Sequence, residues 1–149
     1  MKKLLLILLF LISSTVFTQD KGFGLGVILG EPTGISFKGW TSKTNAIDGG
    51  MAWSFTKSTA LHLHADYLWH SFDVIESEEN IPLYYGVGAR VKFGNKDNNR
   101  LGVRGIIGLN YLMRKVPVDF FIEIAPILDL IQSTEFSMNG GIGVRYFFR

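Results

Sequence analysis

The sequence predicts an all-β fold: a closed, antiparallel, up-and-down transmembrane β-barrel of eight strands, following an N-terminal signal peptide. Three observations lead to this prediction. Apolar side chains recur at every second position along most of the 149 residues, which is the pattern of two-faced strands. The positions between them are rich in glycine and poor in charge. The chain also opens with a short basic segment and an apolar run, as secreted proteins do.

The N-terminal segment has the layout of a secretory signal peptide. Lys2 and Lys3 precede the unbroken apolar run 4–12, and the small residues 13–15 follow. This run is shorter than the roughly 20 residues that a membrane-spanning helix needs. We expect residues 1–18 to be removed and residues 19–149 to form one barrel domain. The chain has no cysteine, so it can form no disulfide bond.

Four strands are expected in the first half of the mature chain. Each has apolar residues at alternate positions, and turn-forming segments lie between them: Glu31 to Thr33, 42–45 and 56–59. The expected strands are 22–29, 35–40, 47–55 and 61–70.

Four more strands are expected in the second half. They are 83–93, 101–110, 118–125 and 138–148, with polar connections at 94–99, 114–117 and 131–134. The longest connection is acidic and covers residues 73–80. With an even number of strands and both termini in the periplasm, it would be periplasmic, although periplasmic turns are usually short. Either this barrel departs from the rule, or the first half contains a miscounted strand.

The two faces of the strands indicate which side meets lipid. A soluble barrel lines its interior with the apolar face, and its outer face carries many Lys and Glu residues. Here the other face consists mostly of Gly, Ser, Ala and His, as expected for a crowded lumen. Aromatic residues on the apolar face gather near strand ends, as at Trp53, Trp69 and Tyr146, which is typical of membrane interfaces. We therefore favour a membrane barrel; a soluble periplasmic ligand-binding barrel is the alternative.

The C-terminal residues carry the most specific resemblance. Gly143, Tyr146 and Phe148 lie in the segment GVRYFF, which resembles the C-terminal signal that the barrel-assembly machinery recognises. The mature chain as a whole resembles the small eight-stranded outer-membrane barrels of the OmpA/OmpX type. This resemblance implies a bacterial outer-membrane location, contact with the lipid bilayer and lipopolysaccharide, and assembly by that machinery. Arg149 after the last aromatic residue and Gly141 at a usually polar position depart from the pattern.

Charged side chains on the inward face must find partners. An eight-stranded barrel is just wide enough for side chains to fill it, and an unpaired buried charge is costly. We predict that Glu123 pairs with Arg145, Arg104 or both. We expect a polar network that plugs the lumen rather than a gate or proton path. Its predicted members are Glu123, Arg145, Arg104, Arg90 and Asp66, and the same face also holds Asp48, His62, His64 and Lys92.

One group of residues on the fourth strand resembles a catalytic or metal site. His62, His64 and Asp66 project to one side, and Ser54 lies on the neighbouring strand with the same parity. This spacing could hold a metal ion or an acid–base pair. Some small outer-membrane barrels are lipid A acylhydrolases or acyltransferases that use His and Ser, but no motif of theirs matches residue by residue. We interpret the histidines as lumen residues that hydrogen-bond to neighbours, and we expect no metal and no cofactor.

These observations favour a non-enzymatic outer-membrane barrel with a structural or surface-interaction role. The net charge of +2 and the lack of a basic–aromatic pattern argue against nucleic-acid binding. The loops could contact an external macromolecule. A lipid A-modifying enzyme is the second hypothesis, and the soluble binder is the third.

Overall fold

A computed structural model describes residues 22–31, 33–54, 60–76, 78–94, 99–113, 115–131 and 134–148. The expected signal peptide, residues 1–18, lies outside this part, as does Arg149. No helix in the described ranges is long and apolar enough to cross a bilayer.

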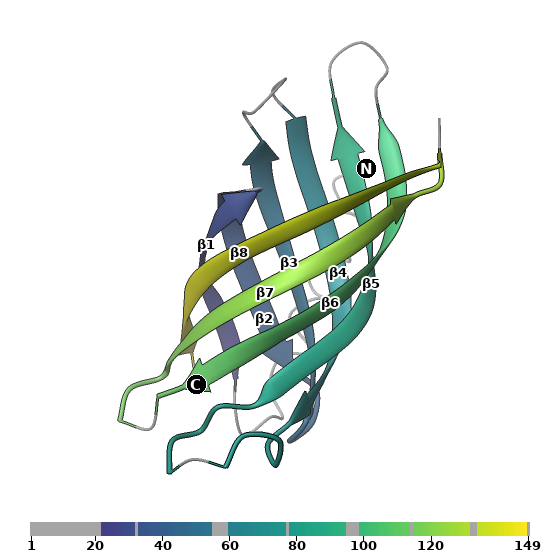
Figure 1. Cartoon of the computed structure of the whole chain (residues 1–149). Coiled ribbons are helices and arrows are strands. Elements are labelled where there is room, and N and C mark those ends of the chain that lie inside the picture. Colours follow the sequence, from purple (N-terminus) through teal and green to yellow (C-terminus); the bar gives the residue numbers. More distant parts are fainter. Residues whose placement is uncertain are drawn as a thin grey trace, which may run out of the picture.

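The described chain is a closed antiparallel barrel of eight strands, which confirms the predicted architecture and strand count. Each strand pairs with the next, and the last pairs with the first. Figure 1 shows the strands inclined to one another around the barrel. The strands are β1 (Phe23–Glu31), β2 (Thr33–Trp40), β3 (Asn45–Ser54), β4 (Ala60–Ser71), β5 (Leu83–Phe93), β6 (Arg100–Leu112), β7 (Val118–Asp129) and β8 (Glu135–Phe148).

The largest error in the predicted boundaries concerns β7. The sequence pattern predicts that this strand ends at 125, but it continues through Pro126 to Asp129. Pro126 keeps its pairing with Met138 of β8. The β6–β7 ladder, in contrast, has no pair between Arg104–Ile127 and Ile107–Ile124, because proline has no N–H to donate. A proline inside a strand thus removes part of one ladder without ending the strand.

The seam between β1 and β8 closes the barrel. Its register runs from Phe23 opposite Phe148 to Glu31 opposite Gly140. Gly26 is needed here, because a Cβ at this position would overlap the Val144 carbonyl group and the Arg145 backbone. The two strands therefore approach each other more closely than a side chain at residue 26 would allow.

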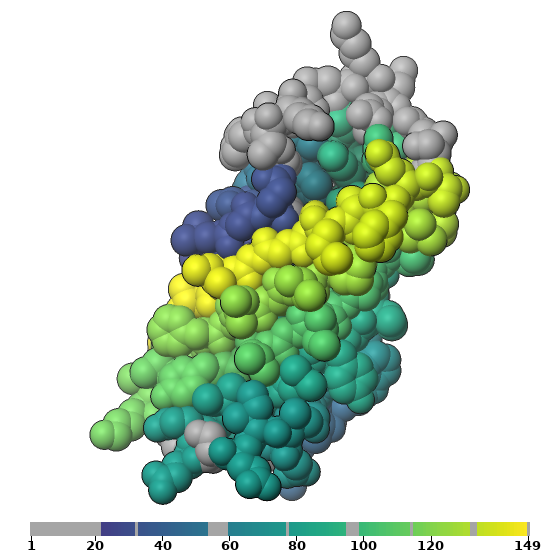
Figure 2. Space-filling model, in the orientation of Figure 1, coloured from purple at the N-terminus to yellow at the C-terminus, as the bar shows by residue number. Residues whose placement is uncertain are grey.

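The outer wall of the barrel is apolar, as the alternation predicts. Large hydrophobic side chains are exposed on every strand; examples are Val27, Ile47, Val87 and Ile122. Figure 2 shows that β6, β7 and β8 form a continuous wall on one side of the molecule.

Exposed aromatic rings lie near both ends of this wall. One group is Phe23, Tyr67, Trp69, Tyr85, Tyr146 and Phe148, and the other is Trp53, Phe93 and Phe136.

The connections differ between the two ends of the barrel. The terminal end, where β1 begins and β8 ends, carries the connections 41–44, 72–82 and 113–117. The opposite end, which we call the hairpin end, carries the connections at 32, 55–59, 94–99 and 130–134. The long acidic connection therefore lies at the same end as both barrel termini. Because the strand count is correct, this placement is a property of the protein and does not come from a miscounted strand.

Candidate functional site: the polar lumen

The lumen contains most of the buried charge in the described chain. Inward positions alternate with the apolar outward ones, and they bring together acids, bases and amides from seven strands. The buried polar residues are Ser36, Lys38, Asp48, His62, Asp66, His70, Arg90, Arg104, Asn110, Asp119, Glu123, Asp129 and Arg145. Charged groups in such a lumen must be paired to be tolerated.

Arg145 pairs with Asp119 and not with Glu123. The two residues are Cα partners in the β7–β8 ladder. Arg145 Nε and Nη2 donate to the two carboxylate oxygens of Asp119 at 3.0 and 3.1 Å. Glu123 lies opposite Gly141, further along β7. The predicted Glu123–Arg145 pair is therefore replaced by a bidentate Asp119–Arg145 pair, which is the strong form of this interaction.

A chain of hydrogen bonds extends from this pair toward β4. Asn110 Nδ2 donates to Asp119 Oδ2 at 3.0 Å, and Lys38 Nζ donates to Asn110 Oδ1 at 2.8 Å. Lys38 Nζ also lies 2.7 Å from His70 Nε2, and His70 Nδ1 lies 3.0 Å from the Thr44 carbonyl oxygen. Both contacts are satisfied when the His70 proton is on Nδ1. The buried ammonium is thus held by neutral acceptors.

A second group of contacts crosses the middle of the lumen around Arg104. Its Nε lies 3.1 Å from Asp66 Oδ1, and its Nη2 lies 3.7 Å from Glu123 Oε1. The Tyr84 hydroxyl donates to Glu123 Oε2 at 2.7 Å. Arg104 is one of the two partners predicted for Glu123, and it lies between two carboxylates.

A separate ion-pair group lies near the hairpin end. Arg90 Nη2 donates to both oxygens of Asp129 at 2.7 and 2.8 Å. Arg100 lies 3.5 Å from the same carboxylate and also contacts the exposed Glu135. Paired charges therefore lie near this end of the lumen as well as in its middle.

Two of the four residues of the catalytic-like group, His64 and Asp66, lie close together. His64 Nε2 lies 3.8 Å from Asp66 Oδ2. Neither ring nitrogen of His62 has a hydrogen-bond partner in the described chain, which differs from the expectation that both histidines bond to neighbours. Ser54 lies opposite Ala60 in the ladder, and its side chain lies outside the described part. Asp48, from β3, takes the third place beside His64 and Asp66.

The three residues of the C-terminal signal lie on both faces of β8. Tyr146 and Phe148 point outward, and their rings meet edge to face at a centroid distance of 5.1 Å. Gly143 lies opposite Phe121. A Cβ at Gly143 would collide with the Phe121 ring and would lie 2.6 Å from the Val27 carbonyl oxygen. The glycine therefore makes room for an inward aromatic ring.

Several members of the network are not among those predicted from the sequence. Lys38, Tyr84, Asn110, Asp119 and Asp129 are all buried in the lumen. Four of them have inward parity on their predicted strands, so the alternation is the signal that could have identified them; Asp129 lies beyond the predicted end of its strand. Two of them, Asn110 and Tyr84, carry no charge, so the need to pair buried charges does not point to them.

The fold and the lumen together define a class: a closed β-barrel with an apolar outer wall and an ion-paired interior. Comparisons with protein-family models, curated proteins and solved structures found no match to this chain.

Proposed function

We propose that this chain is a non-enzymatic outer-membrane β-barrel protein with a structural or surface-interaction role. The observation that carries the proposal is its inverted polarity: apolar side chains cover the outside, and paired charges fill the inside. A wall of this kind is stable when lipid chains cover it, since water would meet a continuous apolar surface.

The positions of the aromatic residues support the same orientation. Aromatic rings gather at the two ends of a transmembrane wall, at the level of the lipid headgroups. At the terminal end, Trp69 stacks on Tyr85 with a centroid distance of 6.0 Å, and Tyr67 contacts Trp69 at 5.0 Å. We infer that these rings contact lipopolysaccharide or phospholipid headgroups and that barrel-assembly machinery inserts the chain.

The filled lumen supports a role other than transport. Arg145 and Asp119 are 1% and 0% exposed, and the cavity beside His64 measures only about 10 Å³. Small-molecule sites usually measure a few hundred cubic ångströms or more. The barrel then serves the envelope through its wall and its connections, by stabilising the membrane or by contacting a macromolecule.

No specific observation favours either of the two alternative functions. A soluble ligand-binding barrel would place its apolar side chains around a ligand, whereas here they face outward. A lipid A-modifying enzyme would need its His–Ser–acid group accessible from the lipid side, whereas His62 and Asp66 are buried in the lumen.

Two measurements test the proposal. The full chain is expressed with its N-terminal segment, and we expect it in the outer-membrane fraction, with faster SDS-gel migration of unheated samples. Recovery as a soluble protein would contradict the proposal. Mass spectrometry of lipid A from the same cells should show unchanged acylation, and a lost or added acyl chain would favour the enzyme instead.

A further inference from the structure

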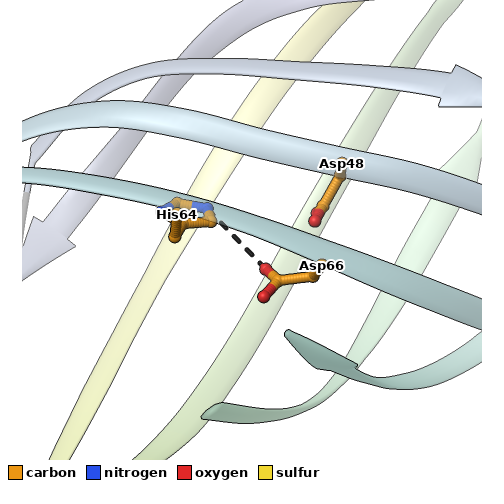
Figure 3. A group of neighbouring side chains, drawn as sticks. All are labelled: Asp48, His64 and Asp66. Atoms are coloured by element: carbon orange, nitrogen blue, oxygen red, sulfur yellow. Dashed lines mark ion pairs between the residues drawn. The ribbon is translucent and has the colours of Figure 1, made fainter. Parts of the chain in front are cut away.

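Two carboxylates face each other in the middle of the lumen. Asp48 of β3 and Asp66 of β4 are Cα partners, and they are only 4% and 3% exposed. Figure 3 shows the two side chains directed toward the same space, with the His64 ring beside them. Like charges placed opposite each other destabilise a sheet. This arrangement therefore needs a compensating positive charge or a shared proton.

The nearby arginines compensate this pair only in part. Arg104 Nε lies 3.1 Å from Oδ1 of Asp66, and Arg145 Nη1 lies 3.9 Å from Oδ2 of Asp48. The other two oxygens, Asp66 Oδ2 and Asp48 Oδ1, are buried and accept no hydrogen bond from any described residue. Asp66 Oδ2 faces His64 Nε2. Asp66 Oδ1 also accepts no hydrogen bond from a described residue, although it lies beside Arg104. Each carboxylate thus has one oxygen beside an arginine and at least one oxygen without a donor.

The charges of the central network leave an excess of negative charge at this place. Four buried carboxylates, Asp48, Asp66, Asp119 and Glu123, meet three buried cations, Lys38, Arg104 and Arg145. Two hydrogen bonds hold Arg145 on Asp119, and Arg104 lies between Asp66 and Glu123. Asp48 has the longest ion-pair distance of the four. A buried carboxylate without a close partner is costly, so a cation next to Asp48 would stabilise the lumen.

We propose that Asp48, His64 and Asp66 bind a divalent transition-metal ion of the zinc class. Their ligand atoms all lie within 4.8 Å of one another. Zinc accepts imidazole nitrogen together with carboxylate oxygen in a tetrahedral arrangement. Calcium prefers six to eight oxygen ligands, so a site with one histidine and two aspartates favours zinc over calcium.

The surroundings provide space for a fourth ligand. A cavity of about 10 Å³ is lined by His64 and Arg104, and it extends along the lumen to Asn139 and to Glu31 at the end of β1. This volume accommodates about one water molecule. The Asn139 amide nitrogen also has no hydrogen-bond partner in the described chain. Of the three proposed ligands only His64 lines this cavity, so we infer that a water molecule on the His64 side of the metal ion supplies the fourth ligand.

Gly50 of β3 makes room for the His64 ring. A Cβ on Gly50 would lie 2.6 Å from His64 Cε1 and 3.2 Å from His64 Nε2. Only glycine therefore lets the ring lie this close to β3, where it meets Asp48. The proposed site differs from the sequence-based expectation of no metal. It does not depend on the proposed membrane role, because every ligand lies inside the barrel.

The test is zinc binding by the full-length barrel in detergent micelles after treatment with a chelator. Equilibrium dialysis against ZnCl₂ with elemental analysis should give one Zn²⁺ per chain. We expect His64→Gln and Asp48→Asn each to weaken binding at least tenfold. His62→Gln is the matched control: this buried histidine lies on the same strand and the same face, and its replacement should leave the affinity unchanged.

A second readout does not depend on whether the variants fold. Co²⁺ added to the wild-type barrel should give the visible absorption of a four-coordinate site, and Zn²⁺ should abolish it. Ca²⁺ and Mg²⁺ should not compete. Failure of the wild-type barrel to bind Zn²⁺ would overturn the proposal and favour a proton shared between Asp48 and Asp66. Equal binding by wild type and His64→Gln would also overturn it.

Discussion

At the residue scale, the lumen contains ion pairs of two kinds. The pair Arg145–Asp119 is fully buried, with two hydrogen bonds. The pair Arg100–Glu135 lies near the hairpin end and has an exposed carboxylate. Solvent screens an exposed pair, so it contributes little to stability. Removal of one partner from a buried pair leaves a charge that water cannot reach.

This difference predicts unequal effects of two similar substitutions. Asp119→Asn should lower the free energy of unfolding by about 3–5 kcal/mol, because Arg145 loses its close partner. Glu135→Gln should lower it by less than about 1 kcal/mol. Urea-induced unfolding of both variants in the same detergent or liposomes measures the difference. Equal losses would show that the buried pair is not a main source of stability.

Two substitutions of Glu123 can distinguish the contribution of its charge from that of its hydrogen bond with Tyr84. Glu123→Ala removes the acceptor of the Tyr84 hydroxyl and one carboxylate beside Arg104. Glu123→Gln keeps an acceptor for Tyr84. We expect both to reduce resistance to thermal unfolding, with a larger loss for alanine, because an unsatisfied buried donor costs about 1–3 kcal/mol. Unchanged thermal resistance of Glu123→Ala would contradict the role of the network as a structural plug.

At the element scale, strand β8 shows how glycines shape the lumen. Gly143 admits the Phe121 ring, which lies 4.0 Å from the Arg145 guanidinium. Gly140, on the same strand, has more room, because a Cβ at this position would lie 3.4 Å or more from its neighbours. The two glycines thus have different roles, and they also have opposite parity on β8: Gly143 shares the inward face with Arg145, and Gly140 shares the outward face with Ile142.

Alanine substitution at these two positions should separate the roles. Gly143→Ala should cost about 1–3 kcal/mol from overpacking, and Gly140→Ala should be nearly neutral. The folded fraction is measured on unheated SDS gels after refolding into detergent without assembly machinery. A normal yield for Gly143→Ala in detergent, together with poor assembly in cells, would assign this glycine to recognition by the machinery instead of packing.

The limits of sequence reasoning also appear at this scale. Alternation identifies the strands and their inward faces, because a period of two is a local property. It does not give the register between strands, which depends on turn geometry and on how far each strand extends. Of the two partners predicted for Glu123, Arg104 is therefore found and Arg145 is not, since the register places Arg145 opposite Asp119. The extension of β7 past Pro126 is equally hidden, because only one of its two ladders is interrupted there.

At the scale of the whole molecule, two valines can test whether lipid surrounds the wall. Val87 lies in the middle of β5 and Val74 lies in the connection 72–82, and they are 60% and 59% exposed. In a bilayer, Val87→Arg should cost about 2–4 kcal/mol, whereas Val74→Arg should cost almost nothing. Unfolding in liposomes measures both. If water surrounds the wall, the two substitutions should have similarly small effects.

The architecture of the whole molecule was predictable from the same alternation that identified the individual strands. Eight amphipathic strands without a helix can avoid exposed edges by closing into a barrel. The face with the charged residues then lines the lumen, and the apolar face forms the outer wall. The metal-ligand group was only partly predictable. His64 and Asp66 share a strand, but Asp48 joins them through the β3–β4 register, which the sequence does not reveal.

The unequal lengths of the connections determine how much of the protein would protrude from the membrane on each side. If both barrel termini face the periplasm, the 11 residues 72–82 do so too, and the hairpin end faces outward with connections of at most six residues. An antibody or a phage tail fibre at the outer surface would then find few protruding segments to bind. The end with the longest acidic segment would face the periplasm instead.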